Sequence, residues 1–225
     1  MPKLSLHLIQ PEAVINKNYV YSCFNAMKMI SDSMSWVMNF KDDDSNVDDI
    51  SRIYERNYII TFVSKLSEAG FNKLDLIGGE VAKSFDVGLN QNYAKLYAKI
   101  KKGINPNYNR TPSIVFPDFL IHKSHGKEDI NRSNQHFIIE AKTNTIDKKE
   151  YFYLDFLKLN FYLENLNYEN AAYLIINNKQ SDIQSYLNDY TNEFTYYYKG
   201  ICEKLYFFIQ EEYNSEPQIY VLTNQ

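Results

Sequence analysis

Two short apolar runs that contain charged residues constrain the fold of this chain more than any other feature. The first run, at 113–122, is rich in β-branched and aromatic residues, and the second run, at 136–142, is similarly apolar. The segment 123–135 between them is charged and rich in turn-forming residues. This composition predicts two antiparallel strands that are joined by a long loop.

The charged residues of the two runs are spaced so that they share one face of the predicted sheet. Side chains alternate between the two faces of a strand, which places Asp118 on the same face as Leu120. The same alternation groups Glu140 and Lys142 with Ile138. Asp118, Glu140 and Lys142 therefore meet if the two strands pair in a suitable register.

These three side chains form a chemically specific set. Charged groups are rare on covered faces unless they are paired or bind a metal ion. Carboxylate oxygens are the hard ligands that Mg²⁺ and Mn²⁺ prefer, and Mg²⁺ commonly takes one or two carboxylates together with waters and phosphate oxygens. Asp118 and Glu140 therefore predict a Mg²⁺ or Mn²⁺ site for a phosphate ester, with Lys142 placed to act on a metal-bound water.

A structural interpretation of the same residues stays open. Glu140 and Lys142 can form an ion pair on a solvated sheet face, and Asp118 can cap a turn after Pro117. Against this, Phe116 falls on the face of Asp118, which favours a face that is at least partly covered.

The pair Pro117-Asp118, followed by Glu140-Ala141-Lys142, resembles the bipartite signature of the PD-(D/E)xK nuclease superfamily, which has the restriction-endonuclease-like fold. The resemblance implies an α/β protein whose core is a helix, a mixed central β-sheet, a helix and a strand, here with helical N- and C-terminal additions. It implies that Asp118, Glu140 and the main-chain carbonyl of Ala141 hold Mg²⁺ or Mn²⁺. Lys142 then stands beside the attacking water, and the implied activity is hydrolysis of phosphodiester bonds, in DNA more than in RNA.

Helical patterns flank the two runs in the order that the family requires. The segment 49–69 predicts the first core helix, and the segment 147–166 predicts the second. The second contains Asp155-Phe-Leu-Lys158-Leu, which is similar to a helix that follows the lysine in several nuclease groups, although Asp155 and Lys158 also fit a simple i,i+3 pair. A buried strand at 171–176 then completes the crossover.

A third acidic residue is often donated to the metal site by the first core helix of this family. Glu55 is the first candidate for that role, although an exposed carboxylate beside Arg52 or Arg56 is an equal explanation. Glu80, which follows the strand-like segment 74–79, is the second candidate.

The rest of the chain is expected to add to this core within a single globular domain. Residues 1–48 predict an N-terminal helical extension, residues 49–180 the nuclease core, and residues 181–225 a C-terminal helical and strand addition. Within the last segment we expect 194–212 to continue the helical structure and 219–222 to form an edge strand.

The basic residues near the predicted site are the candidates for nucleic-acid contacts. The formal net charge of −4 argues against a general polyanion binder, so nucleic-acid binding would depend on local patches of basic residues. The run before the first strand includes Lys95 and Lys101, although such a run is as often a solvated face. The candidates are Lys99, Lys102, Arg110, Lys123 and Lys158.

Location and partners follow from the cysteines, the apolar runs and the resemblance. Cys23 and Cys202 are far apart and lack a metal-type spacing, which favours a reducing, cytoplasmic location. No apolar run is long enough to span a bilayer, and the N-terminus lacks the features of a signal peptide, so no membrane is expected. Family analogy implies a role in phage defence or DNA repair, with a protein partner or as a homodimer. The alternatives are an RNA-directed nuclease and an inactive nuclease-fold scaffold that binds a protein partner or nucleic acid.

Overall fold

The computed structural model describes residues 3–31, 47–69, 75–79, 83–84, 91–112, 114–123, 135–194, 200–213 and 215–224. Its helices are the 3-10 helix η1 (Pro11–Val14), α1 (Asn18–Ser31), α2 (Val47–Glu68), α3 (Gln91–Ile104), α4 (Lys149–Asn165) and α5 (Gln180–Glu193). Its strands are β1 (Leu4–Ile9), β2 (Asp75–Gly79), β3 (Lys83–Ser84), β4 (Ile114–Val115), β5 (Phe119–Lys123), β6 (Gln135–Lys142), β7 (Asn170–Ile176), β8 (Leu205–Gln210) and β9 (Gln218–Asn224).

A mixed sheet of seven strands forms the centre of the molecule, in the order β1-β9-β8-β7-β6-β5-β2. β6, β7 and β8 run parallel to one another, and every other neighbouring pair is antiparallel. β3 and β4 pair separately as a small second sheet. The predicted α/β class with a mixed central sheet is confirmed.

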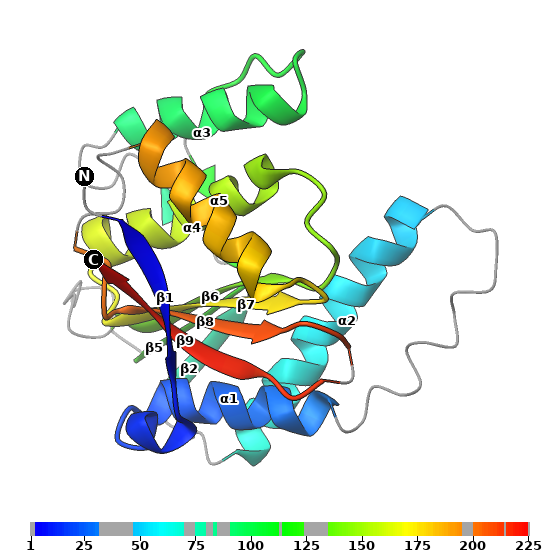
Figure 1. Cartoon of the computed structure of the whole chain (residues 1–225), viewed down its shortest axis with the longest axis vertical. Coiled ribbons are helices and arrows are strands. Elements are labelled where there is room, and N and C mark those ends of the chain that lie inside the picture. Colours follow the sequence, from blue (N-terminus) through cyan, green and yellow to red (C-terminus); the bar gives the residue numbers. More distant parts are fainter. Residues whose placement is uncertain are drawn as a thin grey trace.

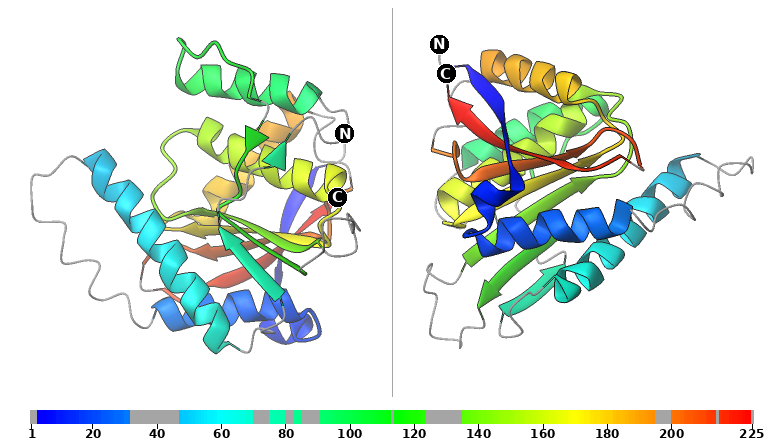
Figure 2. Two further views of the ribbon diagram at one scale, coloured as in Figure 1. Left: turned by 180° about the vertical axis from the view of Figure 1, so that it is seen from behind. Right: turned by 60° about the horizontal axis from the view of Figure 1, so that its bottom comes forward.

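Helices cover both faces of this sheet (Figures 1 and 2). α3, α4 and α5 lie on one side, and α1 and α2 lie on the other. Inner strands that are covered on both faces need apolar side chains throughout, and all six residues of β8 are accordingly buried. The buried apolar residues fall into two clusters, one on each side of the sheet.

α4 is the most deeply buried helix that the structure describes. It packs against α3 and α5 on one side and against β6 and β7 on the other. A helix surrounded in this way must be apolar around most of its circumference, and most of its residues from Phe152 to Leu163 are buried. Asp155 is a charged residue within that buried stretch. None of the described helices is both long and apolar enough to cross a bilayer.

The local elements around the predicted site are confirmed. The strand that contains Glu140 is β6, and it pairs antiparallel with β5 as expected. The predicted helices at 49–69 and 147–166 correspond to α2 and α4, and the predicted buried strand at 171–176 is β7, parallel to β6.

The prediction of one continuous strand at 113–122 is wrong. The segment divides into β4 and β5, which belong to different sheets. Pro117 lies in the break, since proline fixes its own φ and has no N–H for a strand ladder. Phe116 is consequently 52% exposed, and it does not cover the face of Asp118 as the sequence indicated.

Two predictions about the C-terminal segment are also wrong. The aromatic run inside 194–212 contains β8, a buried strand, where helix was expected. β9 is not at the edge, because β1 pairs with its outer side. Gln184 of α5 then satisfies the outer edge of β1: its side chain accepts from the Leu6 N–H at 2.9 Å and donates to the Leu4 carbonyl at 3.0 Å.

Candidate active site

β6 places two of the predicted site residues on one face of the sheet. Glu140 and Lys142 point toward α4, where they contact Lys158 and Asp155 respectively. Ala141, between them, belongs to the apolar cluster on the opposite side of the sheet. Both charged residues lie near the carboxyl end of β6, beside the parallel strand β7, which is the edge at which ligands bind in many open α/β sheets.

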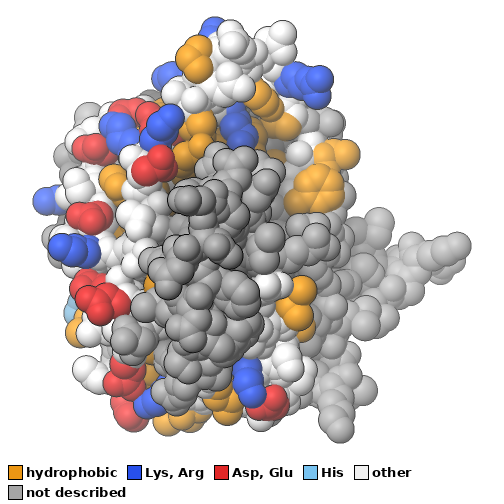
Figure 3. Space-filling model, turned by 90° about the vertical axis from the view of Figure 1, so that its right-hand side faces the viewer, with side chains coloured by type: hydrophobic (Ala, Val, Ile, Leu, Met, Phe, Trp, Pro, Cys, Tyr) orange, Lys and Arg blue, Asp and Glu red, His pale blue; other side chains and the backbone are white. Residues whose placement is uncertain are grey.

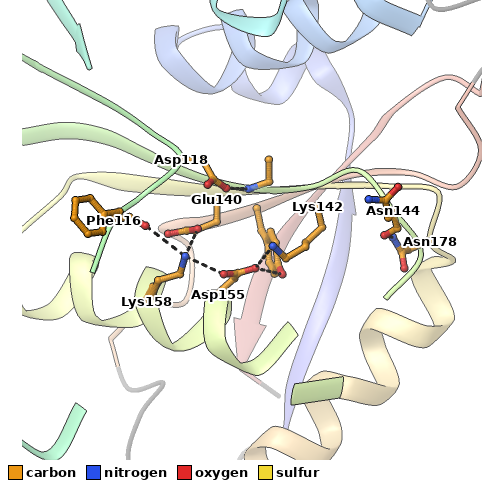
Figure 4. Close-up of polar contacts among 10 residues, drawn as sticks. Phe116, Asp118, Glu140, Lys142, Asn144, Asp155, Lys158 and Asn178 are labelled. Carbon is orange, nitrogen blue, oxygen red and sulfur yellow. Dashed lines mark hydrogen bonds and ion pairs between the residues drawn. The ribbon is translucent and has the colours of Figure 1, made fainter. Parts of the chain in front are cut away.

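Asp118 immediately precedes β5 and reaches across to β6. Its Oδ2 accepts a hydrogen bond of 2.7 Å from the main-chain N–H of Ala141. This bond places the Asp118 carboxylate one residue along the backbone from both Glu140 and Lys142 (Figure 4). The structure therefore brings together the two halves of the Pro-Asp and Glu-x-Lys pattern.

Glu140, Lys142, Asp155 and Lys158 form an ion-pair cluster between β6 and α4. Lys158 Nζ lies 2.5 Å from Glu140 Oε2 and 2.9 Å from Asp155 Oδ1. Lys142 Nζ lies 3.1 Å from Asp155 Oδ2. The hydroxyl of Tyr173, from β7, donates to the same Oδ2 at 3.1 Å. Asp155 thus links the two lysines (Figure 4).

Burial and ion pairing shift the pKa values of this cluster in opposite directions. Burial raises the pKa of Glu140 well above its usual value, although Lys158 acts to lower it. Burial likewise raises the pKa of Asp118. Burial would also raise the pKa of Asp155, but Lys142 and Lys158 outweigh it and lower that pKa to about 2. The structure therefore favours the charged form of Asp155 strongly, whereas burial works against the charged forms of Asp118 and Glu140 and the neighbouring lysines work in their favour.

Glu140 retains an unsatisfied oxygen that fits a metal ion. Its side chain is 1% exposed, and Oε1 has no hydrogen-bond partner among the described residues. A buried carboxylate oxygen without a partner costs free energy that a coordinated cation would offset. The donor set of Asp118 and Glu140 is the hard oxygen chemistry that Mg²⁺ and Mn²⁺ prefer.

The third acidic ligand stays a prediction. Within the described part of the chain, no group of three or more His, Cys, Asp and Glu side chains is arranged to hold a metal ion. Glu55 lies on α2 where only the backbone is described, and α2 covers the face of the sheet opposite to Glu140. Glu80 lies outside the described residues.

Asn178, which follows β7, fixes the loop that leaves β6 after Lys142. Its Oδ1 accepts from the Ile146 N–H at 2.7 Å, and its Nδ2 donates to the Asn144 and Ile176 carbonyls at 2.9 and 2.7 Å. These bonds join the loop after β6 to the loop after β7, so they fix the positions of the carboxyl ends of β6 and β7 relative to each other (Figure 4).

The exposed candidates for nucleic-acid contacts lie on and after α3. Lys99, Lys102 and Arg110 are exposed. Figure 3 shows Lys and Arg side chains over the upper part of the molecule, at the height of α3. Lys99 Nζ, however, lies 5.4 Å from the ring centroid of Phe194, which turns it toward the end of α5.

Two other candidates for nucleic-acid contacts lie elsewhere. Lys158 is part of the ion-pair cluster, with a side chain only 12% exposed, so it is placed inside the site and not on an open surface. The side chain of Lys123, at the end of β5, lies outside the described residues.

Sequence reasoning missed two members of the site. The sequence places Asp155 in a helix similar to one that follows the lysine in several nuclease groups, or in an i,i+3 pair with Lys158, but does not assign it to the site. It places Tyr173 in a buried strand without a role. A signal for Asp155 does exist in the sequence, because it is flanked by Leu154 and Phe156 in a helix that is otherwise apolar. No comparable signal marks Tyr173, whose role depends on the pairing of β7 with β6.

Comparison of this chain with protein-family models, with curated proteins and with solved structures found no match.

Proposed function

We propose that this protein is a metal-dependent nuclease that hydrolyses phosphodiester bonds, with DNA as the favoured substrate. The observation that supports this most strongly is the convergence of Asp118, which immediately precedes β5, with Glu140 of the antiparallel neighbour β6. Asp118 bonds to the backbone of Ala141 at 2.7 Å, and the adjacent Glu140 is buried with one unpartnered oxygen. Lys142 follows on the same face.

The order of the elements supports a restriction-endonuclease-like core. The resemblance calls for a helix, three or four strands, a helix and a last strand. The chain supplies these as α2, β2, β5, β6, α4 and β7. β2, β5 and β6 are antiparallel neighbours, and β7 returns parallel to β6 after the α4 crossover.

Asp118, Glu140 and the main-chain carbonyl of Ala141 would hold Mg²⁺ or Mn²⁺. The bound ion would polarise the phosphoryl oxygens and lower the pKa of a coordinated water. Asp118 is oriented for this role by its bond to the Ala141 N–H, and Glu140 offers Oε1.

The two lysines of the cluster have different tasks in this proposal. Asp155 holds the Lys142 ammonium at 3.1 Å, and the Lys142 side chain is 26% exposed, so it can donate to the attacking water or to a phosphate oxygen. Lys158 is buried between Glu140 and Asp155 and neutralises both carboxylates. It therefore serves as a positioning residue.

One observation favours a second candidate function, a nuclease-fold scaffold that binds a partner without cutting. Each charged side chain of the ion-pair cluster already has an opposite charge within 3.1 Å. In that case the cluster contributes to the specificity of the fold and has no catalytic role.

A cleavage assay separates these functions. Single- and double-stranded DNA and RNA are incubated with the protein in Mg²⁺, in Mn²⁺ and in EDTA, beside Asp118→Asn and Lys142→Met. The exposed residues Asp147 and Lys148 give matched controls as Asp147→Asn and Lys148→Met. We expect metal-dependent cutting by the wild type and the controls, and a loss of about a hundredfold or more in each site variant. Absence of cutting of every substrate at micromolar protein would favour the scaffold, and equal cutting by Asp118→Asn would indicate a contaminant.

The biological setting rests on the resemblance. We propose a cytoplasmic enzyme that acts in phage defence or DNA repair, with a protein partner or as a homodimer. The same assay identifies an RNA-directed enzyme if RNA is cut in preference to DNA.

A further inference from the structure

α3 packs antiparallel against α4, the helix that carries Asp155 and Lys158 of the ion-pair cluster. At one end the Tyr93 hydroxyl donates to Glu164 Oε2 at 2.7 Å, and the Tyr93 ring packs on Phe161 with centroids 5.3 Å apart. At the other end Gly103 lies against the side chain of Glu150, whose Cγ would be 3.2 Å from a Cβ at that glycine. The N-terminal end of α3 therefore lies beside the C-terminal end of α4, and the C-terminal end of α3 lies beside the N-terminal end of α4.

This antiparallel alignment fixes which residues of α3 lie opposite the ion-pair cluster. Tyr97 and Lys101 follow Tyr93 at intervals of one helical turn, so they lie on the same side of α3. Tyr93 lies beside Phe161, and Gly103 lies beside Glu150. Tyr97 and Lys101, which come between Tyr93 and Gly103 on α3, therefore lie opposite the turns of α4 that contain Lys158 and Asp155.

Burial along α3 agrees with this placement. Tyr93 is buried, and Tyr97 and Lys101 are half-buried, whereas Lys95 and Lys102 are exposed on the other side of the helix. Lys101 is also close enough for the charges of Asp155, Lys158 and Lys142 to act on its pKa, which burial lowers.

Lys101 differs from the two lysines of the cluster, because it has no carboxylate partner among the described residues. Within the part of the chain that the structure describes, no Asp or Glu oxygen forms an ion pair with it, whereas Lys142 and Lys158 are paired with Asp155. A half-buried ammonium that lacks a counterion is a strong donor to an incoming anion, because it has already lost part of its hydration.

We propose that Lys101 is a substrate-binding residue whose ammonium binds a non-bridging phosphate oxygen of the nucleic-acid strand at the site. This inference rests on the proposed nuclease function, and it places the substrate backbone along α3. It assigns the phosphate contact on α3 to the side that bears Tyr97 and Lys101. On α3 the proposal replaces the candidate Lys102 with Lys101, and the exposed side that bears Lys95 and Lys102 is not expected to contact the strand.

Binding measured without cutting tests this assignment. A fluorescein-labelled single-stranded DNA oligonucleotide is titrated in EDTA with the wild type, Lys101→Gln, Lys101→Arg and the matched control Lys95→Gln, and anisotropy is recorded at several salt concentrations. We expect Lys101→Gln to weaken binding about tenfold or more. Its slope of log affinity against log salt should fall by roughly 0.7, the value of one phosphate contact on a single strand. Lys101→Arg should recover most of the affinity, and Lys95→Gln should bind as the wild type does.

The outcomes distinguish this inference from the nuclease proposal. Equal affinity and salt slope in Lys101→Gln and the wild type overturn the inference, as does an equal loss in Lys95→Gln or the absence of any binding by the wild type. If the wild type cuts and Lys101→Gln shows no rise in KM, the inference fails while the nuclease proposal stands. If the wild type binds DNA through Lys101 but never cuts it, the inference stands and the nuclease proposal fails.

Discussion

Lys158 Nζ lies 2.5 Å from Oε2 of Glu140, so a helix and the central sheet are joined by an ion pair inside the protein. Both partners are largely shielded from water, with side chains 12% and 1% exposed. Only one oxygen of Glu140 is satisfied by this contact, and the other has no described partner. The ion pair thus pairs a buried carboxylate with a cation and leaves its second oxygen without a described partner, which is where the proposed metal ion would bind.

Removal of the Lys158 ammonium should destabilise the fold. In Lys158→Met the Glu140 carboxylate loses its partner while its burial stays, which costs about 3 kcal/mol of unfolding free energy for a buried ion pair. Urea unfolding in EDTA measures the loss, and adding Glu140→Gln to Lys158→Met should restore part of it. A loss below about 1 kcal/mol would show that the pair is well solvated.

Acid should selectively remove the contribution of Asp155 to stability. Its pKa is lowered from 3.8 to about 2 in the folded protein, so the contribution is complete above pH 3.8 and is lost as the pH falls toward 2. The expected size is on the order of 2 kcal/mol. The raised pKa values of Asp118 and Glu140 change the unfolding free energy in the opposite direction as the pH falls. The contribution of Asp155 is therefore measured as a difference in unfolding free energy between the wild type and a variant.

That difference is the gap in unfolding free energy between the wild type and Asp155→Asn, measured by urea unfolding at a series of pH values. The gap should be largest near neutral pH and should narrow as the pH falls below about 4. A gap that stays constant with pH would mean that Asp155 is not held as an anion by the two lysines.

The hydroxyl of Tyr173 should stabilise the folded protein through its bond to Asp155. Tyr173→Phe removes the 3.1 Å donor to Asp155 Oδ2, a hydrogen bond to a charged group, at a cost of about 2 kcal/mol. Tyr186→Phe is the matched control, because it removes a 3.2 Å bond to the neutral Ile146 carbonyl and should cost about 1 kcal/mol or less. If urea unfolding shows equal losses in the two variants, the charge of Asp155 adds nothing to the bond.

Stabilisation by Mn²⁺ should depend on pH. Burial raises the pKa of Glu140 and of Asp118, so protons compete with the metal ion as the pH falls, since only the deprotonated carboxylates are ligands. Saturating Mn²⁺ should raise Tm by roughly 5 °C at pH 8 and by clearly less at pH 5.5. Glu140→Gln should show a clearly smaller Tm shift than the wild type at pH 8, and a wild-type shift that is equal at both pH values would contradict the assignment of these ligands.

Much of the neighbourhood of the site could be predicted from local sequence patterns. The alternation in β6 correctly placed Glu140 and Lys142 on one face, because a strand within a covered sheet has a strict two-residue period. α4 was also predictable, since its length and apolar content exclude a strand.

The errors arose where long-range packing decides the structure. The apolar run of β8 fits a helix or a strand equally well by periodicity, and its six residues form a strand because they pair with β7 and β9. The pairing of β1 with β9 joins residues from opposite ends of the chain, which no local pattern reveals. The partnership of Asp155 with Lys142 likewise depends on how α4 crosses β6.

The central claim is that Asp118 and Glu140 bind one divalent cation together, and a calorimetric Mn²⁺ titration tests it most directly. The wild type and the exposed control Asp147→Asn should bind Mn²⁺, and both Asp118→Asn and Glu140→Gln should weaken that binding at least about tenfold while remaining folded. Mn²⁺ binding with wild-type affinity in both site variants, or no binding by the wild type, would contradict the account.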